Sequence, residues 1–406
     1  MSSATAPSRS ERDIGAAGRE RRSGVTELTT RIAIIGGGLS GLYAASLLEE
    51  QGIKDYLVFE ARDRFGGRIH SASASRSPAS TVDAMPHALG RFDLGPAWYW
   101  PSVQPQLDRL IRELGLDRFP QYDAGDTVVE PGTGERPTRV LGYTSFPTAM
   151  RVVGSMAALT DALRRRANQT RLMSGRRVRT VRCQAEYLEL DVEGGGGQAV
   201  TCRAERLLLA VPPRLAVASI DFVPALPEGL SRQWKDAATW MAPHAKYLAL
   251  YDTPFWRERG LSGDARSGRG PLAEVHDAST PEGGAALFGF FGVPANARRG
   301  VEDDVLKSRC RAQLGRLFGA QAATPRFDII KDWASDPYTA TAEDQNGIAF
   351  HGAAPMARAE AGIWRDRLVG IASEWSPQFP GYVAGAVEAA ILGLSAVLES
   401  ATREAT

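Results

Sequence analysis

The chain has 406 residues, of which 43% are hydrophobic and 23% charged, and its formal net charge is +1. A length beyond the ~100–200 residues of one typical domain predicts two packed units or one large interrupted domain. The balanced charge gives no basic surplus, so we expect no nucleic-acid partner. We find no apolar run of the ~18 residues that a membrane helix needs, and we therefore expect a soluble protein without a membrane partner.

The first elements in chain order predict an α/β fold. Residues 1–30 are rich in Ser, Ala, Gly, Arg and Glu, offer little to bury, and are expected to form a disordered leader. Residues 31–35 are apolar and predict a buried strand, which is followed by a helix over 39–51 and a second strand over 55–60. This βαβ unit implies a parallel sheet.

The remaining elements follow from periodicity and from Gly and Pro punctuation. We expect helices over residues 101–116, 155–167 and 383–400, and strands over residues 187–192, 206–211 and 246–251. The turn-rich residues 122–148 are interpreted as a crossover between domains. Residues 260–285, rich in Gly, Ser and Arg, are expected to form a loop.

A glycine-rich turn between the first strand and the first helix has the dinucleotide-binding pattern GxGxxG. It reads Gly36-Gly-Gly38-Leu39-Ser40-Gly41. Gly36 permits a tight turn, Gly38 lets the backbone approach a pyrophosphate, and Gly41 lets the helix pack closely on the strand. The positive end of the helix dipole then faces the phosphates, so the pattern predicts a dinucleotide site.

The end of the second strand adds two further signals. Glu60 is placed to accept hydrogen bonds from ribose hydroxyls, and its charge disfavours the 2′-phosphate of NADP. The segment that follows reads Ala61-Arg62-Asp-Arg-Phe-Gly66-Gly67-Arg68. Its paired glycines let backbone amides and the guanidinium groups converge on a diphosphate. A solvated arginine-rich turn is the alternative interpretation.

Together with several later segments, these motifs resemble the FAD-dependent amine oxidase family, the monoamine and polyamine oxidase group of flavoproteins. The later segments are Phe92-Asp-Leu-Gly95, Ala210-Val-Pro-Pro213, the strand of Lys246 leading to Pro254-Phe-Trp256, Trp333, and Gly381-Tyr-Val-Ala-Gly-Ala-Val-Glu388. The resemblance implies a Rossmann-like (glutathione-reductase-type) FAD-binding domain interleaved with an α+β substrate-binding domain. The former would use residues 31–98, 155–242 and 364–400, and the latter residues 99–154 and 243–363.

The resemblance also implies where FAD is bound. The backbone of Val178 would meet the adenine, and the helix that begins near Tyr382 would point its N-terminus at the pyrimidine edge of the flavin. Glu374 and Val383 are further expected cofactor contacts. The family members with covalent flavin have a cysteine near the position of Ala342, and none stands there in this chain. Non-covalent FAD is therefore expected.

We expect three residues to take part in catalysis. Lys246 matches the lysine that holds a water against the flavin N5, and it is one of only five lysines among 48 basic residues. Tyr382 would form one wall of an aromatic cage around the amine. Glu343 stands where the second aromatic is often found, and it either pairs with a second cationic group of the substrate or lies on a loop facing water. The expected substrate-pocket residues are Trp98, Trp333 and Trp375.

These expectations predict oxidation of a primary or secondary amine, diamines and polyamines included, to an imine that hydrolyses to an aldehyde or ketone. Dioxygen would be reduced to hydrogen peroxide. No cation follows Gly95 to bind a substrate carboxylate, and the five histidines show no metal-ligand spacing. The alternatives are another FAD-dependent oxidoreductase, namely a desaturase, a porphyrinogen oxidase or an L-amino-acid oxidase, and a non-catalytic flavin-binding protein. Three scattered cysteines favour the cytoplasm, and a homodimer is an open possibility.

Overall fold

The computed structural model describes residues 26–72, 90–132, 134–194, 199–345 and 352–404. The first strand, β1 (Thr26–Ile35), begins within the expected leader, so the prediction of disorder was wrong for its last five residues. Residues Thr26 to Thr30 pair in parallel with Val200 to Ala204, which gives their backbone groups hydrogen-bond partners. The rest of the leader, residues 1–25, lies outside the described residues.

The first body of the molecule is built on a sheet of eight strands within the described residues. Its order is β13 (Asp221–Val223), β10 (Arg177–Cys183), β11 (Leu188–Glu193), β12 (Ala199–Leu209), β1, β2 (Tyr56–Phe59) and β9 (Leu172–Met173), with β19 (Leu368–Gly370) beside β12. β1 is parallel to both β2 and β12. The predicted parallel βαβ unit is confirmed.

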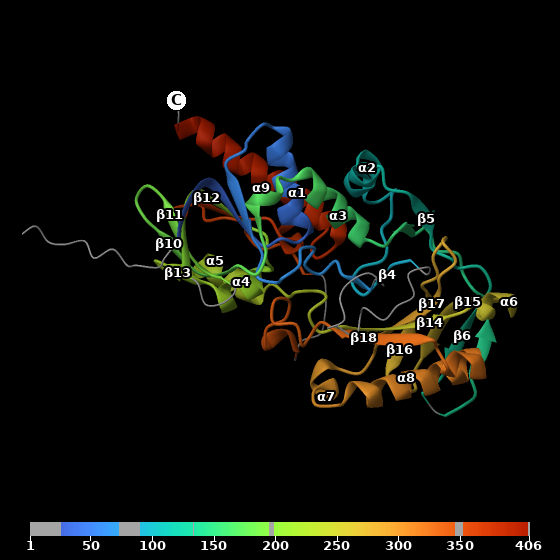
Figure 1. The fold of residues 1–406 in the computed structure, drawn as a ribbon. Coiled ribbons are helices and arrows are strands. Elements are labelled where there is room, and N and C mark those ends of the chain that lie inside the picture. Colours follow the sequence, from blue (N-terminus) through green and yellow to red (C-terminus); the bar gives the residue numbers. More distant parts are fainter. Residues whose placement is uncertain (1–25, 73–89, 133, 195–198, 346–351, 405–406) are drawn as a thin grey trace, which may run out of the picture.

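Helices cover both faces of this sheet. Figure 1 shows α1 (Leu39–Glu50), α3 (Ala157–Arg166) and α9 (Val383–Glu404) side by side on one face, while α4 (Pro213–Ser219) and α5 (Glu228–Asp236) lie on the other side. Residues Val383–Ser400 of α9 are long and apolar enough to cross a membrane, contrary to our expectation from the sequence. Because 61% of this stretch is buried inside the fold, α9 is a core helix of this body.

The second body is built on a seven-stranded sheet within the described residues. Its order is β18 (Phe327–Asp332), β14 (Ala245–Tyr251), β17 (Ala285–Phe291), β16 (Leu272–Asp277), β15 (Leu261–Ser267), β6 (Asp126–Glu130) and β7 (Thr138–Val140). The helix α8 (Asp303–Phe318) covers one face, with the short helices α6 (Phe255–Glu258) and α7 (Ala295–Arg298) beside the sheet (Figure 1).

The expected loop over residues 260–285 was wrong, because this stretch contains the strands β15 and β16. Close packing requires small residues in this stretch. A Cβ at Gly263 would lie 2.9 Å from the Cβ of Asp277 and 3.0 Å from the indole nitrogen of Trp256, so only glycine fits there. The crossover over 122–148 likewise contributes β6 and β7 to the second sheet.

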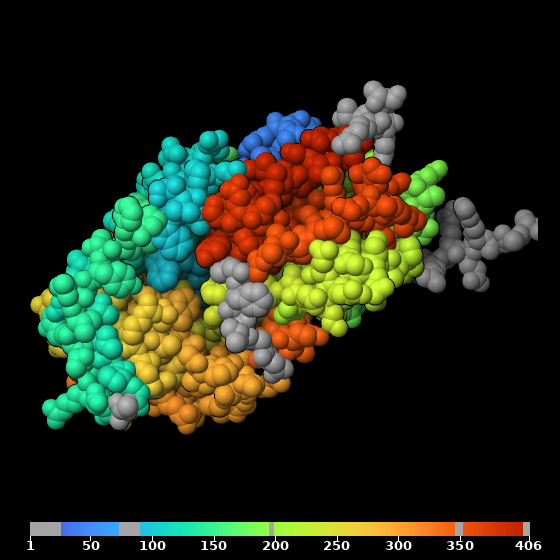
Figure 2. Space-filling model, turned by 180° about the vertical axis from the view of Figure 1, so that it is seen from behind, coloured from blue at the N-terminus to red at the C-terminus, as the bar shows by residue number. Residues whose placement is uncertain are grey.

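The chain passes between the two bodies several times. After β3 (Ser71–Ala72) and β4 (Phe92–Asp93) it forms α2 (Pro105–Glu113), β5 (Arg118–Pro120) and β8 (Met150–Val152). In Figure 2 the cyan and teal segment that contains α2 and β6 runs along one end of the molecule, from the first body to the second. The strands of each sheet therefore come from separated parts of the sequence.

Candidate active site

A cavity of about 550 Å³ lies between the two bodies. One side is formed by the turn between β1 and α1, the segment after β2, the segment after β12 and the start of α9. The other side is formed by residues of β14, β16 and β17. The cavity is therefore completed only when both bodies are in place.

The glycine-rich turn borders the cavity through Gly36, Gly38, Leu39 and Ser40. Gly36 has φ +107°, and a Cβ there would lie 2.7 Å from the carbonyl oxygen of Ala210. A Cβ at Gly38 would have only the Cα of Gly67 near it, at 3.9 Å, so this backbone is open to a ligand. Since α1 begins at Leu39, its positive dipole end lies at the cavity.

Gly41 does not line the cavity, and it acts through packing. A Cβ at this position would lie only 2.0 Å from the carbonyl oxygen of Gly36. The third glycine of the motif thus sets how closely α1 approaches β1, as the pattern predicts.

Glu60 is buried at the edge of the cavity, beside Ala61, and its carboxylate is held by the backbone. It accepts a hydrogen bond from the Gly37 amide and another from the Arg62 amide, both of 2.8 Å. A carboxylate has about four lone-pair positions, so acceptor capacity remains for ligand hydroxyl groups.

Arg62 lines the cavity, yet its guanidinium is engaged by the segment that follows β18. Its Nη2 donates to Asp336 Oδ1 at 2.7 Å and to Thr339 Oγ1 at 3.0 Å. Burial opposes ionisation of Asp336, but the nearby Arg62 and Lys331 outweigh it and hold its pKa below the ordinary value. The Arg62 guanidinium also lies 5.3 Å from the ring centroid of Tyr338, which borders the cavity. Sequence reasoning missed Asp336 and Tyr338, which follow no recognised motif.

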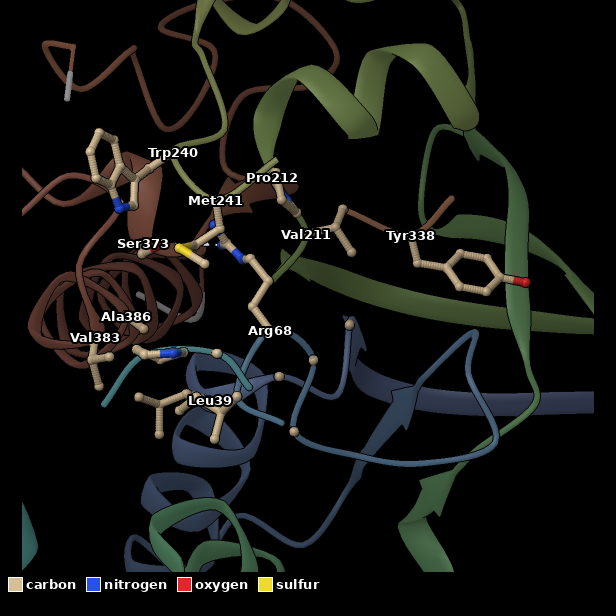
Figure 3. Close-up of a pocket in the computed structure, with 18 of the residues that line it drawn as sticks. Leu39, Arg68, Val211, Pro212, Trp240, Met241, Tyr338, Ser373, Val383 and Ala386 are labelled. Carbon is tan, nitrogen blue, oxygen red and sulfur yellow. Dashed lines mark hydrogen bonds between the residues drawn. The ribbon is translucent and has the colours of Figure 1, made fainter. Parts of the chain in front are cut away.

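Arg68 also lines the cavity, with Gly66 and Gly67, and has a buried counterion. Its Nη2 donates to Glu374 Oε2 at 3.0 Å and to Ser373 Oγ at 3.2 Å, and Figure 3 shows this side chain extended between the turn and Ser373. Glu374 is not among the residues lining the cavity. The expectation of a direct cofactor contact for Glu374 is thus replaced by a role in holding Arg68.

The start of α9 forms another part of the wall. Tyr382, which is 38% exposed, and Val383 border the cavity, as does Val178 from β10. Gly381 has φ +83° and donates its amide to the Ser373 carbonyl at 3.0 Å, which fixes the entry into the helix. In Figure 3 Val383 and Ala386 of α9 lie close to Leu39 of α1. Two helix N-termini therefore border the same space.

Lys246 reaches the cavity from β14 and is only 1% exposed. Its Nζ donates to the carbonyls of Gly95 at 2.8 Å and Asp93 at 3.1 Å, and it lies 4.2 Å from the ring centroid of Phe288. Burial lowers the pKa of Lys246 to about 7, although the nearby Asp93 acts in the opposite direction. This lysine is thus poised to exchange a proton near neutral pH.

Of the three predicted pocket tryptophans, only Trp98 lines the cavity. Trp333 is fully buried and donates its indole N–H to the Leu94 carbonyl at 3.2 Å. Trp375 donates to the Met356 carbonyl at 3.2 Å and packs edge-to-face on Trp234. The predicted pocket positions of Trp333 and Trp375 were wrong, because both indoles are satisfied within the core.

The structure places Glu343 away from the cavity. It is exposed at the start of a short turn, Glu343–Gln345, and does not line the cavity, so the alternative of a side chain facing water holds. Among the described residues that line the cavity, the acidic ones are Glu60 and Glu274. Sequence reasoning missed Glu274 because it lies in the stretch interpreted as a loop.

Fold and cavity together define an α/β protein with a dinucleotide site, and comparison with known proteins specifies its class. A model of NAD(P)-binding Rossmann-like domains matches residues 34–114. A model of flavin-containing amine oxidoreductases matches residues 141–393, more than half of the chain. The chain belongs to this family, is a flavin-dependent amine oxidase, and has FAD as its expected cofactor.

Individual relatives agree with this family. The chain is 24% identical to a probable flavin-containing monoamine oxidase A of Dictyostelium discoideum, over 76% of this chain and 84% of the relative. It is 24% identical to a putrescine oxidase of Kocuria rosea, over 81% and 88%. A structure of putrescine oxidase bound to putrescine superposes with a TM-score of 0.73 at 21% identity, covering 92% of this chain and all of that chain. Cyclohexylamine oxidase from Brevibacterium oxydans gives 0.73 at 19% identity, over 92% and 99%. These two structures share the fold.

Proposed function

We propose that the protein oxidises a primary or secondary amine to an imine, which hydrolyses to an aldehyde or ketone, while dioxygen is reduced to hydrogen peroxide. The observation that carries this proposal is one continuous cavity. It joins the glycine-rich dinucleotide turn of the first body to the buried Lys246 and to an aromatic wall on the second body. The names of the relatives, monoamine oxidase and putrescine oxidase, support an amine as substrate.

The residues around the cavity fit FAD. The open backbone at Gly38 and the two helix N-termini suit a pyrophosphate and the electron-rich edge of a flavin, and Glu60 suits the ribose hydroxyls. When bound, FAD would supply the oxidant, because it can accept a hydride equivalent, one proton with two electrons, from the carbon next to the amine nitrogen and can pass the two electrons to dioxygen. We propose that Leu39, Ser40, Arg68, Val178 and Val383 complete its binding site, in the first body, with the substrate domain in the second.

Non-covalent binding is supported by the cysteines. Cys183, Cys202 and Cys310 are buried and free, and none of them lines the cavity. Free buried thiols also suit a reducing compartment, and we propose a cytoplasmic location for the protein.

The chain's own residues would orient the amine and exclude water. Lys246 has three N–H groups when protonated, and the carbonyls of Gly95 and Asp93 take two of them. The third N–H, or the lone pair of the neutral amine, remains to hold a water or a proton. Tyr382 would contact the reacting amine, and the aromatic side chains Trp98, Phe288 and Phe290 would keep the site dry.

Anaerobic mixing of the holoenzyme with a panel of amines tests this function. We expect amines such as n-butylamine, benzylamine and putrescine to abolish the absorbance of the oxidised flavin, and hydrogen peroxide to form when air is readmitted. Two compounds serve as controls and should leave the spectrum unchanged. n-Butanol has no amino group, and the amino group of L-leucine is next to a carboxylate. If no amine reduces the flavin, the protein is a different FAD-dependent oxidoreductase or a non-catalytic flavin-binding protein.

A further inference from the structure

A buried carboxylate, Asp93 of β4, lies next to the cavity lysine without lining the cavity itself. Asp93 is 5% exposed, and its backbone carbonyl accepts the hydrogen bond of 3.1 Å from Lys246 Nζ. Because only a few covalent bonds separate this carbonyl oxygen from the side-chain oxygens, the carboxylate lies within about 8 Å of Nζ. Figure 1 shows β4 between α3 of the first body and β14 of the second. Asp93 is therefore placed to act on the lysine through its charge.

The carboxylate of Asp93 is held at the N-terminus of α3. Its Oδ1 accepts the amide N–H of Met156, the residue directly before the helix, at 2.9 Å. The positive end of the helix dipole stabilises a carboxylate at this position. Burial raises the pKa of Asp93 to about 6, although Arg151, Lys246 and the Met156 amide all act in the opposite direction. The group is thus mostly ionised at neutral pH.

Arg151 of β8 is the third ionic group of this buried cluster, and it is 3% exposed. Its guanidinium donates to the carbonyls of Ser279 at 2.9 Å and Ala278 at 3.1 Å, so neutral groups hold it in place. Its positive charge favours an ionised Asp93 and a neutral Lys246. Without the carboxylate, a protonated lysine would place two positive charges in this cluster with nothing to offset them.

The other charged groups around the lysine have partners of their own. Lys331 of β18 is the register partner of Lys246, and its Nζ lies 3.1 Å from Asp336 Oδ2. Glu274 lies two strands away on β16 and pairs with Arg266. The strand β17 contributes aromatic rings to the surroundings of Nζ. The buried charges on β4 and β8 therefore have the largest influence on whether the lysine holds a proton.

We propose that Asp93 is a positioning residue that allows Lys246 to hold a proton beside the substrate. This inference rests on the proposed amine oxidation. An amine is mostly protonated in water at neutral pH, and it must lose a proton before a hydride equivalent can leave its carbon. The N–H bond of the substrate breaks, its electron pair stays on the substrate nitrogen, and a new N–H bond forms on Nζ. Asp93 acts through Lys246, because its negative charge offsets the positive charge that arises there.

NMR of the holoenzyme with isotope-labelled lysine tests the proposal directly. The chain has five lysines, and the signal that disappears in Lys246→Met identifies the one in the cavity. In Asp93→Asn the midpoint of its pH titration should fall by about one pH unit or more, because an opposite charge is removed. Asp161→Asn is the control, since it removes a half-exposed carboxylate of the same helix, and it should leave the midpoint unchanged.

The pH profile of flavin reduction by saturating benzylamine, measured without oxygen, gives the second measurement. The limb of this profile on the acid side should move to lower pH in Asp93→Asn by the same amount as the NMR midpoint. Asp93→Glu, which keeps the charge, should return both values towards those of the native enzyme. Arg151→Gln removes a positive charge and should move both values upward, so the proposal remains testable if Asp93→Asn does not fold.

The outcomes separate this inference from the proposed function. An unchanged NMR midpoint in Asp93→Asn would overturn the proposal, even if activity is lost, because Asp93 would then only cap α3. A shifted midpoint with an unchanged pH profile would overturn the role of Lys246 as the proton acceptor. If no amine reduces the flavin in the native enzyme, the amine oxidation itself fails, whereas the NMR midpoint still decides whether Asp93 controls the proton of Lys246.

Discussion

The burial of Lys246 has a consequence for stability as well as for chemistry. Its ammonium is surrounded by carbonyl groups and aromatic rings, and no carboxylate is within ion-pair distance of it in the described residues. Burial lowers its pKa from the ordinary 10.5 to about 7. Between these two pH values the unfolded chain therefore binds a proton at this site that the folded protein does not.

We expect the free energy of unfolding to rise with pH between 7 and 10, by up to about 1.4 kcal/mol per pH unit from this residue. The sign follows because the unfolded state holds more protons there, so raising the pH favours the folded state. Lys246→Met should remove this contribution. Urea unfolding of both proteins at several pH values measures it, and an identical pH slope in the two would contradict the assigned pKa.

Site residues were predictable where a local motif encodes them. Gly36, Gly38 and Glu60 follow from the strand, turn and helix around them, and all three border the cavity. Asp336 and Glu274 could not be predicted, because each reaches the site through long-range packing and neither follows a motif. Glu343 was visible in the sequence near the predicted cage, but spacing along the chain could not show that its side chain is exposed and away from the cavity.

At the scale of single elements, the packing of α1 on β1 depends on one glycine. Gly41 is the third residue of α1, and no side chain fits between it and the carbonyl of Gly36. Gly229, the second residue of α5, offers a contrast, because a Cβ there would have no heavy atom within 4 Å. Both glycines lie in the first turn of a helix, but only at Gly41 is there no room for a Cβ.

Gly41→Ala should lower the free energy of unfolding by about 1–3 kcal/mol, because the clash outweighs the gain in helix propensity. Gly229→Ala should be neutral or stabilising by up to about 1 kcal/mol, since alanine is the better helix former. Urea denaturation of the two variants beside the native protein measures both. Equal effects from the two substitutions would show that the close approach of α1 to β1 does not limit stability.

Elements were predictable to the extent that their signals are local. The apolar strand, the glycines and the apolar helix at residues 31–51 agree within a few residues with β1 and α1. The sequence did not predict the strand β15, because its buried positions hold small and polar residues such as Ser262 and Gly263. These residues fit beside the large Trp256. The packing partner that makes this strand possible lies outside the strand's own sequence.

At the scale of the whole molecule, hydrogen bonds of residues that line the cavity connect the two bodies. Arg62 of the first body bonds Asp336 in the segment that follows β18 of the second, and Lys246 of the second bonds the carbonyl of Gly95. A ligand that fills this cavity contacts both bodies, so its binding energy stabilises their arrangement as well as its own site.

Removal of FAD should therefore lower the unfolding temperature of the entire protein. At a free FAD concentration of about 100 times Kd, the linkage contributes about 2.7 kcal/mol. Calorimetry of the holoprotein and of protein stripped of FAD measures the difference, and readdition of FAD is the control. Identical unfolding temperatures would mean that the cavity residues do not hold the cofactor.

The place of α9 in the chain sets the order in which the enzyme can mature. The glycine turn before α1 leaves the ribosome long before α9, which packs against α1 and supplies Tyr382 and Val383 to the same cavity. The strands and helices between them in the sequence are synthesised in the interval. The wall of the dinucleotide site that α9 supplies is therefore added to the nascent protein late, after α1 and the glycine turn are in place.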